Sequence, residues 1–111
     1  MKNARELVDA LEDKKAEDIL LIDLQGVAIF TDYFVICSGT SDRMIRSLVR
    51  AANDAMVKCC GFKGKPIGSE SNGWVAVDYG SIVLHLFSPQ QRQFYQLEEL
   101  WSSGKTLLRV K

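Results

Sequence analysis

The sequence predicts an α/β fold, a single domain over residues 1–111 with a mixed β-sheet of about five strands flanked by helices. Helical and strand-like patterns alternate along the chain in the order α, β, β, α, loop, β, β, α, β. One pair of strand-like runs forms an antiparallel hairpin, and a long helix elsewhere provides a crossover connection between strands. Together, these two kinds of connection predict a mixed sheet.

The first helix and the first two strands follow from the spacing of apolar residues. Residues 3–16 have the pattern of an amphipathic helix, and Asn3 is its candidate N-terminal cap. The apolar side of this helix carries Ala4, Leu7, Val8 and Leu11. Two apolar runs follow, DILLIDL over residues 18–24 and DYFVICS over residues 32–38, and a turn at Gly26 separates them. Both runs predict interior strands.

The middle of the chain predicts a long helix and then a loop. A helix of about 18 residues begins at Ser41 and ends at Gly61. One of its faces carries three arginines, Arg43, Arg46 and Arg50. This row is either a solvated surface or a patch for an acidic partner, and the solvated surface is the simpler interpretation. The Gly-rich segment 62–73 predicts mostly loop, with room for a short edge strand.

The stretch WVAVDYGSIVLHLF, from Trp74 to Phe87, predicts a β-hairpin with Gly80 and Ser81 as its two-residue turn. In that register, one face of the hairpin pairs apolar residues, namely Tyr79 with Ile82, Val77 with Leu84, and Val75 with Leu86. The other face is mixed, because it pairs Asp78 with Val83, Ala76 with His85, and Trp74 with Phe87.

A third helix and a last strand complete the predicted fold. Ser88 and Gln91 fit a capping box, and Pro89 occupies the first helical position, where proline is favoured. The predicted buried stripe of this helix consists of Phe94, Leu97 and Trp101. Gly104 ends the helix, and TLLRV over residues 106–110 predicts a final strand at an edge of the sheet.

Composition restricts the class of partner. Fourteen basic and fourteen acidic side chains give a net charge of zero. Binding to nucleic acid through phosphates needs a surplus of basic residues, so this balance favours a protein or small-molecule partner. The apolar runs are far shorter than the roughly 20 residues that cross a bilayer, and the N-terminus is unlike a signal peptide, so we expect a cytoplasmic protein. The three cysteines cannot all pair and match no zinc motif, and we expect them to be reduced and mostly buried.

The mixed face of the hairpin admits two interpretations. It is either the less buried side of a sheet or a recognition surface, in which Trp74 and Phe87 anchor a partner beside Asp78 and His85. A catalytic or metal-binding role of His85, the sole histidine, is less favoured. Asp78 is placed to orient its ring, but the sequence offers no recognisable nucleophile and no further metal ligands at suitable spacing.

The loop CSGTSDR, residues 37–43, joins a strand to the N-terminus of the long helix. Such a position either binds an anion or caps the helix. Ser and Asp are ordinary capping residues, and Asp42 would repel a phosphate while it stabilises the helix, so the capping interpretation is favoured.

Three motifs, DYFVICSGTSDR, GWVAVDYGSIVLHLF and RQFYQLEELW, resemble those of the ribosomal silencing factor family, also called Iojap-like proteins, in the same order and over nearly the whole chain. The resemblance implies a nucleotidyltransferase-like topology without the catalytic motif, no catalysed reaction and no cofactor. It implies binding to the large ribosomal subunit at its ribosomal protein number fourteen (uL14), which sterically blocks joining with the small subunit under nutrient limitation. It also implies a possible homodimer, and we expect no direct contact with nucleic acid or membrane.

The candidate partner surface follows from the mixed face and the helix motif. It comprises Trp74, Asp78, His85 and Phe87, with Tyr79 and Gly80 at the turn and, from the third helix, Arg92 and Tyr95, although Tyr95 also fits a core position. The alternative function is a nucleotide-binding or nucleotidyltransferase-like enzyme, suggested by the SGTS turn and the α/β order. Two-metal phosphoryl transfer needs closely paired carboxylates such as Asp-x-Asp on a strand, and this sequence has no such pair. A dimerisation module without a ribosomal role is a third possibility.

Overall fold

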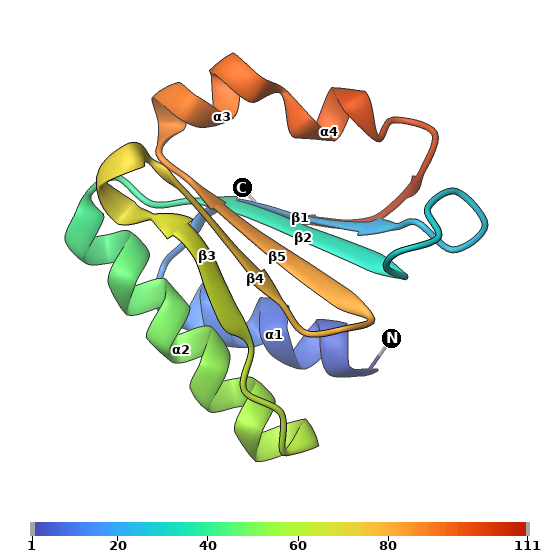
Figure 1. Ribbon diagram of the computed structural model, residues 1–111, viewed down its shortest axis with the longest axis horizontal. Helices are drawn as coiled ribbons and strands as arrows, with labels where there is room; N and C mark the ends of the chain where they lie inside the picture. The colour runs from blue at the N-terminus through green and yellow to red at the C-terminus, as the bar shows by residue number, and fades with distance from the viewer. Residues whose placement is uncertain (1, 111) are drawn as a thin grey trace.

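The computed structural model describes residues 2–110 and arranges them as one six-stranded sheet with helices on both faces (Figure 1). The strand order is β3-β4-β5-β2-β1-β6. The central strands β2 and β5 are parallel, and the other neighbours in this sheet pair antiparallel. The predicted mixed α/β sheet is confirmed, with six strands where about five were expected.

The elements follow one another closely along the chain. They are α1 (Lys2–Asp13), β1 (Glu17–Asp23), β2 (Tyr33–Ser38), α2 (Asp42–Cys60), β3 (Lys65–Ser69), the 3-10 turn η1 (Glu70–Asn72), β4 (Trp74–Asp78), β5 (Ile82–Phe87), α3 (Pro89–Tyr95), α4 (Leu97–Leu100) and β6 (Lys105–Val110). Asn3 lies inside α1, so its prediction as the cap was wrong. The segment predicted as mostly loop contains the edge strand β3 and η1.

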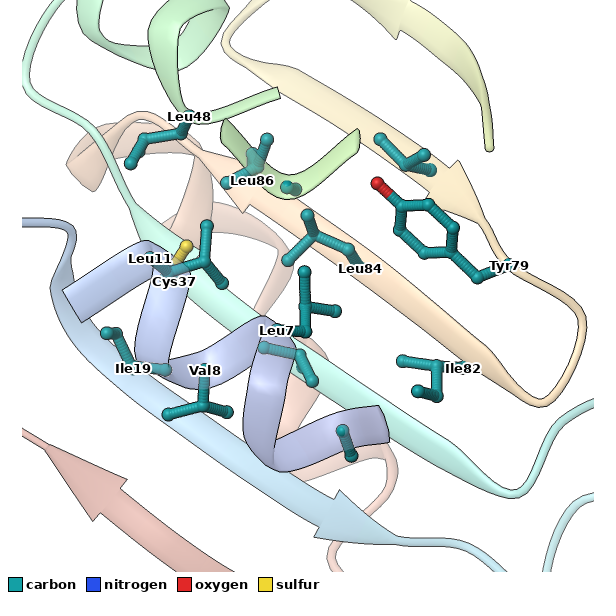
Figure 2. Packing of buried hydrophobic residues seen from close by; sticks show 14 of the residues in the cluster. Leu7, Val8, Leu11, Ile19, Cys37, Leu48, Tyr79, Ile82, Leu84 and Leu86 are labelled. Atoms are coloured by element: carbon teal, nitrogen blue, oxygen red, sulfur yellow. The ribbon is translucent and has the colours of Figure 1, made fainter. Parts of the chain in front are cut away.

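One face of the sheet is covered by α1 and α2, and we call it the aliphatic face (Figure 1). Leu7 and Leu11 of α1 and Leu48 of α2 pack with Leu84 and Leu86 of β5, and all five side chains are fully buried (Figure 2). The apolar side chains of these two helices exclude water from this side of the sheet. The larger of the two hydrophobic cores of the molecule lies here.

The loop before α2 is a helix cap, as the sequence favours. The Oγ atom of Ser41 accepts a hydrogen bond from the backbone N–H of Met44, which satisfies one of the free donors of the first turn. Gly61 ends the helix in the left-handed conformation, with φ of 69°. The arginine row is exposed, and Arg46 pairs with Glu70 at 3.2 Å, which agrees with a solvated surface.

The opposite face is covered by α3 and α4, and we call it the aromatic face (Figure 1). Its core is smaller and combines Phe34 and Phe87 with the aliphatic residues Leu20, Ile22, Leu24, Ile36 and Leu97. Trp101 closes one end of this core, because its ring meets Phe34 edge-on with the centroids 5.7 Å apart. The two short helices cover this face less completely than α1 and α2 cover the other.

The predicted third helix is broken at Gln96, which adopts the left-handed conformation with φ of 48°. In a continuous helix, Phe94, Leu97 and Trp101 would share one face. The break changes the direction of the chain, so that Leu97 is buried but Phe94 is 75% exposed. The predicted buried stripe was therefore wrong for Phe94, and Arg92 faces the sheet from α3 instead.

Two further expectations concern the cysteines and the membrane. Cys37 is buried, but Cys59 and Cys60 are exposed, because they lie in the last turn of α2 on its solvent side. The prediction that the cysteines are mostly buried was wrong for these two. Across residues 2–110, no helix has the length and apolar character needed to span a membrane.

Candidate partner-binding surface

The hairpin forms in the predicted register. Trp74 lies opposite Phe87, Ala76 opposite His85, and Asp78 opposite Val83 on the aromatic face. Gly80 has φ of 85°, which an L side chain rarely adopts, and its N–H donates to Oδ1 of Asp78 at 2.8 Å. The segregation of the two faces that the sequence predicts is thus confirmed.

The predicted exposure of the mixed face is wrong at its centre. Phe87 is fully buried and His85 is 7% exposed. Both side chains lie on β5, a central strand, and are covered by α3 and α4. The residues that the sequence predicts to form a surface here therefore belong to the smaller core. Burial lowers the pKa of His85 to about 4, which keeps the imidazole neutral at physiological pH.

Tyr79 is not exposed at the turn either. Its side chain belongs to the aliphatic face (Figure 2). There its hydroxyl donates to Oδ1 of Asn53 at 2.8 Å. The same oxygen of Asn53 accepts the N–H of Gly64 at 3.1 Å, so the buried amide oxygen has two donors. Burial raises the pKa of Tyr79, which keeps the hydroxyl protonated as a donor. Tyr79 therefore connects the hairpin to α2.

Arg92 is also buried, in contrast to its predicted place on a surface. Its Nη1 donates to the backbone oxygen of Asp18 at 2.6 Å and to Oγ of Ser38 at 3.1 Å, and its Nε donates to Oε1 of Glu98 at 3.2 Å. One guanidinium thus joins α3 to the ends of β1 and β2 and to α4. The guanidinium group is planar and its donors point in fixed directions, so it can hydrogen-bond to several elements at once.

The remaining predicted residues stay accessible. Asp78 and Gly80 are exposed, Trp74 is partly buried, and Tyr95 is 46% exposed. Trp74 and Tyr95 lie together, with ring centroids 4.5 Å apart. The core position that Tyr95 also fits is thus excluded by its exposure.

Two residues that the sequence analysis did not assign to the partner surface extend it. Ile67 on β3 is 63% exposed and pairs with Ala76, and Phe94 meets Tyr95 edge-on with the ring centroids 5.0 Å apart. We define the aromatic patch as Ile67, Trp74, Phe94 and Tyr95. A pocket of about 320 Å³ opens within it, lined by Ile67, Gly68, Asn72, Trp74, Ala76 and Tyr95.

The aromatic patch rests on the core of the aromatic face. Trp74 stacks on the buried ring of Phe87, with centroids 5.0 Å apart and an interplanar angle of 28°. Its indole N–H donates to Nδ1 of His85 at 3.2 Å. The outer side of Trp74 is accessible while its inner side is held by buried rings, which is the arrangement of a rigid anchor residue.

The sequence carried only weak signals for the two missed residues. Ile67 stands in the Gly-rich segment KPIGS, where the strand pattern is too short to assign a face. Phe94 has the spacing of a buried helical residue, and no glycine or proline marks the break at Gln96.

A second group of exposed apolar side chains lies in the loop between β1 and β2 and consists of Val27, Ile29 and Phe30.

Chemistry of other kinds finds little support in the described residues. Within residues 2–110, no group of three or more His, Cys, Asp or Glu side chains is placed to hold a metal ion. A polar pocket of about 280 Å³ lies at the N-terminus of α2 and includes Ser41, Asp42, Glu70 and Ser88. Its two carboxylates disfavour a bound phosphate, which agrees with the capping role of the loop.

Several known proteins have sequences similar to this chain. A family model described as ribosomal silencing factor during starvation matches residues 1–110. The ribosomal silencing factor of Bacillus subtilis (strain 168) is 39% identical over 95 residues, which cover 86% of this chain and 80% of that protein. A protein of Mus musculus named mitochondrial assembly of ribosomal large subunit protein 1 is 38% identical over 100 residues, covering 86% of this chain and 43% of that protein.

A solved structure agrees with the topology. The crystal structure of a protein from Chromobacterium violaceum superposes with a TM-score of 0.84 and 29% sequence identity, and the match covers 91% of this chain and 84% of that one. The family model and the bacterial relatives are named for ribosomal silencing, and the mouse relative is named for ribosomal subunit assembly.

Proposed function

This chain belongs to the ribosomal silencing factor family, and from that membership we propose that it represses translation by binding the large ribosomal subunit. A ribosome-associated regulator of translation is the function that the family supports. The finer proposal is that the chain docks on ribosomal protein number fourteen, on the face of the large subunit that meets the small one. While bound there under nutrient limitation, it prevents the two subunits from joining.

The observation that carries the proposal is the aromatic patch. Exposed apolar side chains gathered around a pocket are typical of protein-binding sites, and aromatic residues dominate the energetic centre of such interfaces. The net charge of zero favours a protein of the ribosome over its RNA as the surface that is contacted. The name of the mouse relative, which refers to the ribosomal large subunit, supports the choice of subunit.

We assign different roles to the residues of the predicted surface. Trp74 and Tyr95 make the central contact, because they are accessible and rigidly supported. Asp78 extends the contact along β4 to a point about 13 Å from Trp74, and Gly80 follows it in the turn. Of the four buried residues, His85 and Phe87 support Trp74 from behind. Tyr79 connects the hairpin to α2, and Arg92 connects α3 to β1, β2 and α4.

The block is steric and needs no chemical step. The chain has principal extents of 35 × 32 × 24 Å, so a bound copy holds the opposing surface away by tens of ångströms.

We place this activity in the cytoplasm. We also propose that a homodimer formed through the aromatic patch competes with the ribosome, because the same apolar side chains then face each other.

Co-sedimentation with large subunits tests the docking site. Trp74→Ala and Tyr95→Ala should each weaken binding by about 2 kcal/mol or more, roughly 30-fold, if they are central contacts. Phe62→Ala is the matched control, because Phe62 is 48% exposed but lies against Tyr79 on the aliphatic face. Undiminished binding of both folded patch variants would refute the assignment.

A subunit-joining assay tests the mechanism. Saturating protein should reduce the fraction of joined ribosomes in a sucrose gradient, and Trp74→Ala should not. If the wild-type chain binds the large subunit but leaves joining unchanged, the steric block is wrong and another role on the subunit is needed. Calorimetry with Mg²⁺ and a nucleoside triphosphate tests the enzymatic alternative, for which we expect no heat of binding.

A further inference from the structure

His85 occupies an unusual place for a histidine, because its ring is enclosed by aromatic rings. Its centroid lies 4.6 Å from that of Phe34, 6.0 Å from that of Trp74 and 6.2 Å from that of Phe87. A leucine or phenylalanine would fill such a site at no cost in desolvation. The presence of a polar ring there calls for a reason beyond packing.

The hydrogen bond to Trp74 supplies that reason. The indole N–H can only donate, so Nδ1 of His85 must accept, and the proton of the neutral imidazole is then on Nε2. Nε2 is buried and has no hydrogen-bond partner among residues 2–110, so within this part of the chain the polar contact of the ring is the one with Trp74. Burial lowers the pKa of His85 to about 4, which keeps Nδ1 available as an acceptor near neutral pH.

The hydrogen bond to His85 determines the orientation of the Trp74 indole at the surface. Trp74 can in principle rotate about its outer side-chain torsion into an opposite orientation, since such torsions are broad and roughly two-fold. The bond to His85 selects the orientation in which the N–H points into the core. In that orientation the ring packs against Tyr95 and lines the 320 Å³ pocket.

We propose that His85 is a positioning residue of the partner-binding surface: by accepting the indole N–H of Trp74, it fixes the orientation in which Trp74 and Tyr95 together meet the partner. This inference rests on the proposed function for its effect on binding. It goes beyond that function because it assigns a role to a buried side chain that the partner does not touch.

Three substitutions separate positioning from packing. His85→Asn places an amide oxygen close to the position of Nδ1, so it can still accept from the indole. His85→Gln places its polar group near the position of Nε2, away from Trp74. His85→Leu keeps apolar volume and has no acceptor. It should be the most stable of the three variants, because asparagine leaves a cavity and both asparagine and glutamine bury an amide.

We expect binding to large subunits to follow a different order from stability. His85→Leu and His85→Gln should weaken binding about fivefold to tenfold per folded molecule, the equivalent of one lost neutral hydrogen bond. His85→Asn should bind within about threefold of the wild type despite its lower stability. Equal binding of His85→Asn and His85→Leu, or tighter binding of His85→Leu, overturns the proposal.

Nuclear magnetic resonance of the free protein tests the same geometry without the ribosome. The indole N–H of Trp74, assigned with the Trp101→Phe variant, should exchange slowly with water in the wild type and in His85→Asn, and quickly in His85→Leu. The ¹⁵N shifts of His85 in the wild type should show a proton on Nε2 and none on Nδ1. A proton on Nδ1 overturns the proposal even if no variant folds.

These measurements also keep the two proposals apart. If the wild-type chain does not bind large subunits, the proposed function fails, while the exchange rates and imidazole shifts still decide whether His85 positions Trp74. If the subunit binds but the indole exchanges equally fast in all four proteins, docking stands and positioning fails.

Discussion

The two faces of the sheet are built from different side chains and closed to different degrees. The aliphatic face is sealed by α1 and α2, whose 12 and 19 residues bury a continuous layer of apolar side chains. The aromatic face is covered by α3 and α4, of seven and four residues. Around the edge of this shorter cover, the aromatic patch remains accessible.

We expect this difference to separate stability from the proposed recognition of a partner. The aliphatic face buries the larger cluster of apolar residues, and burial of apolar surface drives folding. The aromatic face supplies rigid rings that are buried on one side and available on the other, which reduces the entropy lost when a partner binds. Substitutions on the first face should therefore alter unfolding, and substitutions on the second face should alter binding more than their effect on unfolding explains.

The largest expected effect is on the aliphatic face. Leu84→Ala removes a fully buried side chain between two helices and should lower the free energy of unfolding by about 2–5 kcal/mol. Urea denaturation measures this change. Binding to large subunits, corrected for the folded fraction, should stay unchanged, and a loss of binding by folded molecules would contradict the separation of the two faces.

The second expected effect is a pH dependence of stability that comes from the aromatic face. The pKa of His85 is about 4 in the folded chain, below its ordinary value of 6.5, because its ring is buried. Between these values the unfolded chain binds more protons, so the stability that His85 contributes is present above pH 6.5 and is lost as the pH falls toward 4. The loss should reach about 3 kcal/mol.

The measurement is the free energy of unfolding from pH 7 to pH 4, with His85→Leu as the reference that lacks this titration. The difference between the two curves isolates the aromatic face. The buried Cys37 of the aliphatic face has its pKa raised to about 12 by burial, so it does not titrate in this range. Parallel curves for the two proteins would show that His85 is not buried as described.

The smallest effect concerns a polar contact on the aliphatic face. Tyr79→Phe removes the hydroxyl that donates to Asn53, but Asn53 keeps the N–H of Gly64 as a donor. We expect a loss of about 1 kcal/mol in unfolding free energy, typical of one neutral hydrogen bond. Thermal unfolding detects it, and a change above about 3 kcal/mol would mean that the contact organises α2 and the hairpin together.

The sequence predicted the helices and strands well where local patterns agree with burial. The apolar spacing in α1 and α2, the cap at Ser41 and the glycine at position 61 define those helices without tertiary information. The register of the hairpin follows from its turn residues and the alternation on either side. These features depend on residues close together in the chain.

The candidate site was harder to predict, because exposure depends on elements far away in the sequence. The alternation in β5 places His85 on a given face, but whether α3 covers that face is decided by the break at Gln96 and by Arg92, which reaches Asp18 and Ser38. Hence four of the eight predicted residues proved to be buried, and the side chain of one of these, Tyr79, lies on the aliphatic face. Ile67 and Phe94 were missed for the same reason.

The position of the parallel pair in the middle of the sheet has a consequence for synthesis. β2 and β5 lie far apart in the sequence, so β1 and β2 can form a hairpin early, but the sheet cannot close until β5 has left the translating ribosome. Trp74 then gains Phe87 and Tyr95 as supports only after α3 has left the ribosome. A nascent copy therefore lacks a completed aromatic patch until the segment from β3 to α3 has been made.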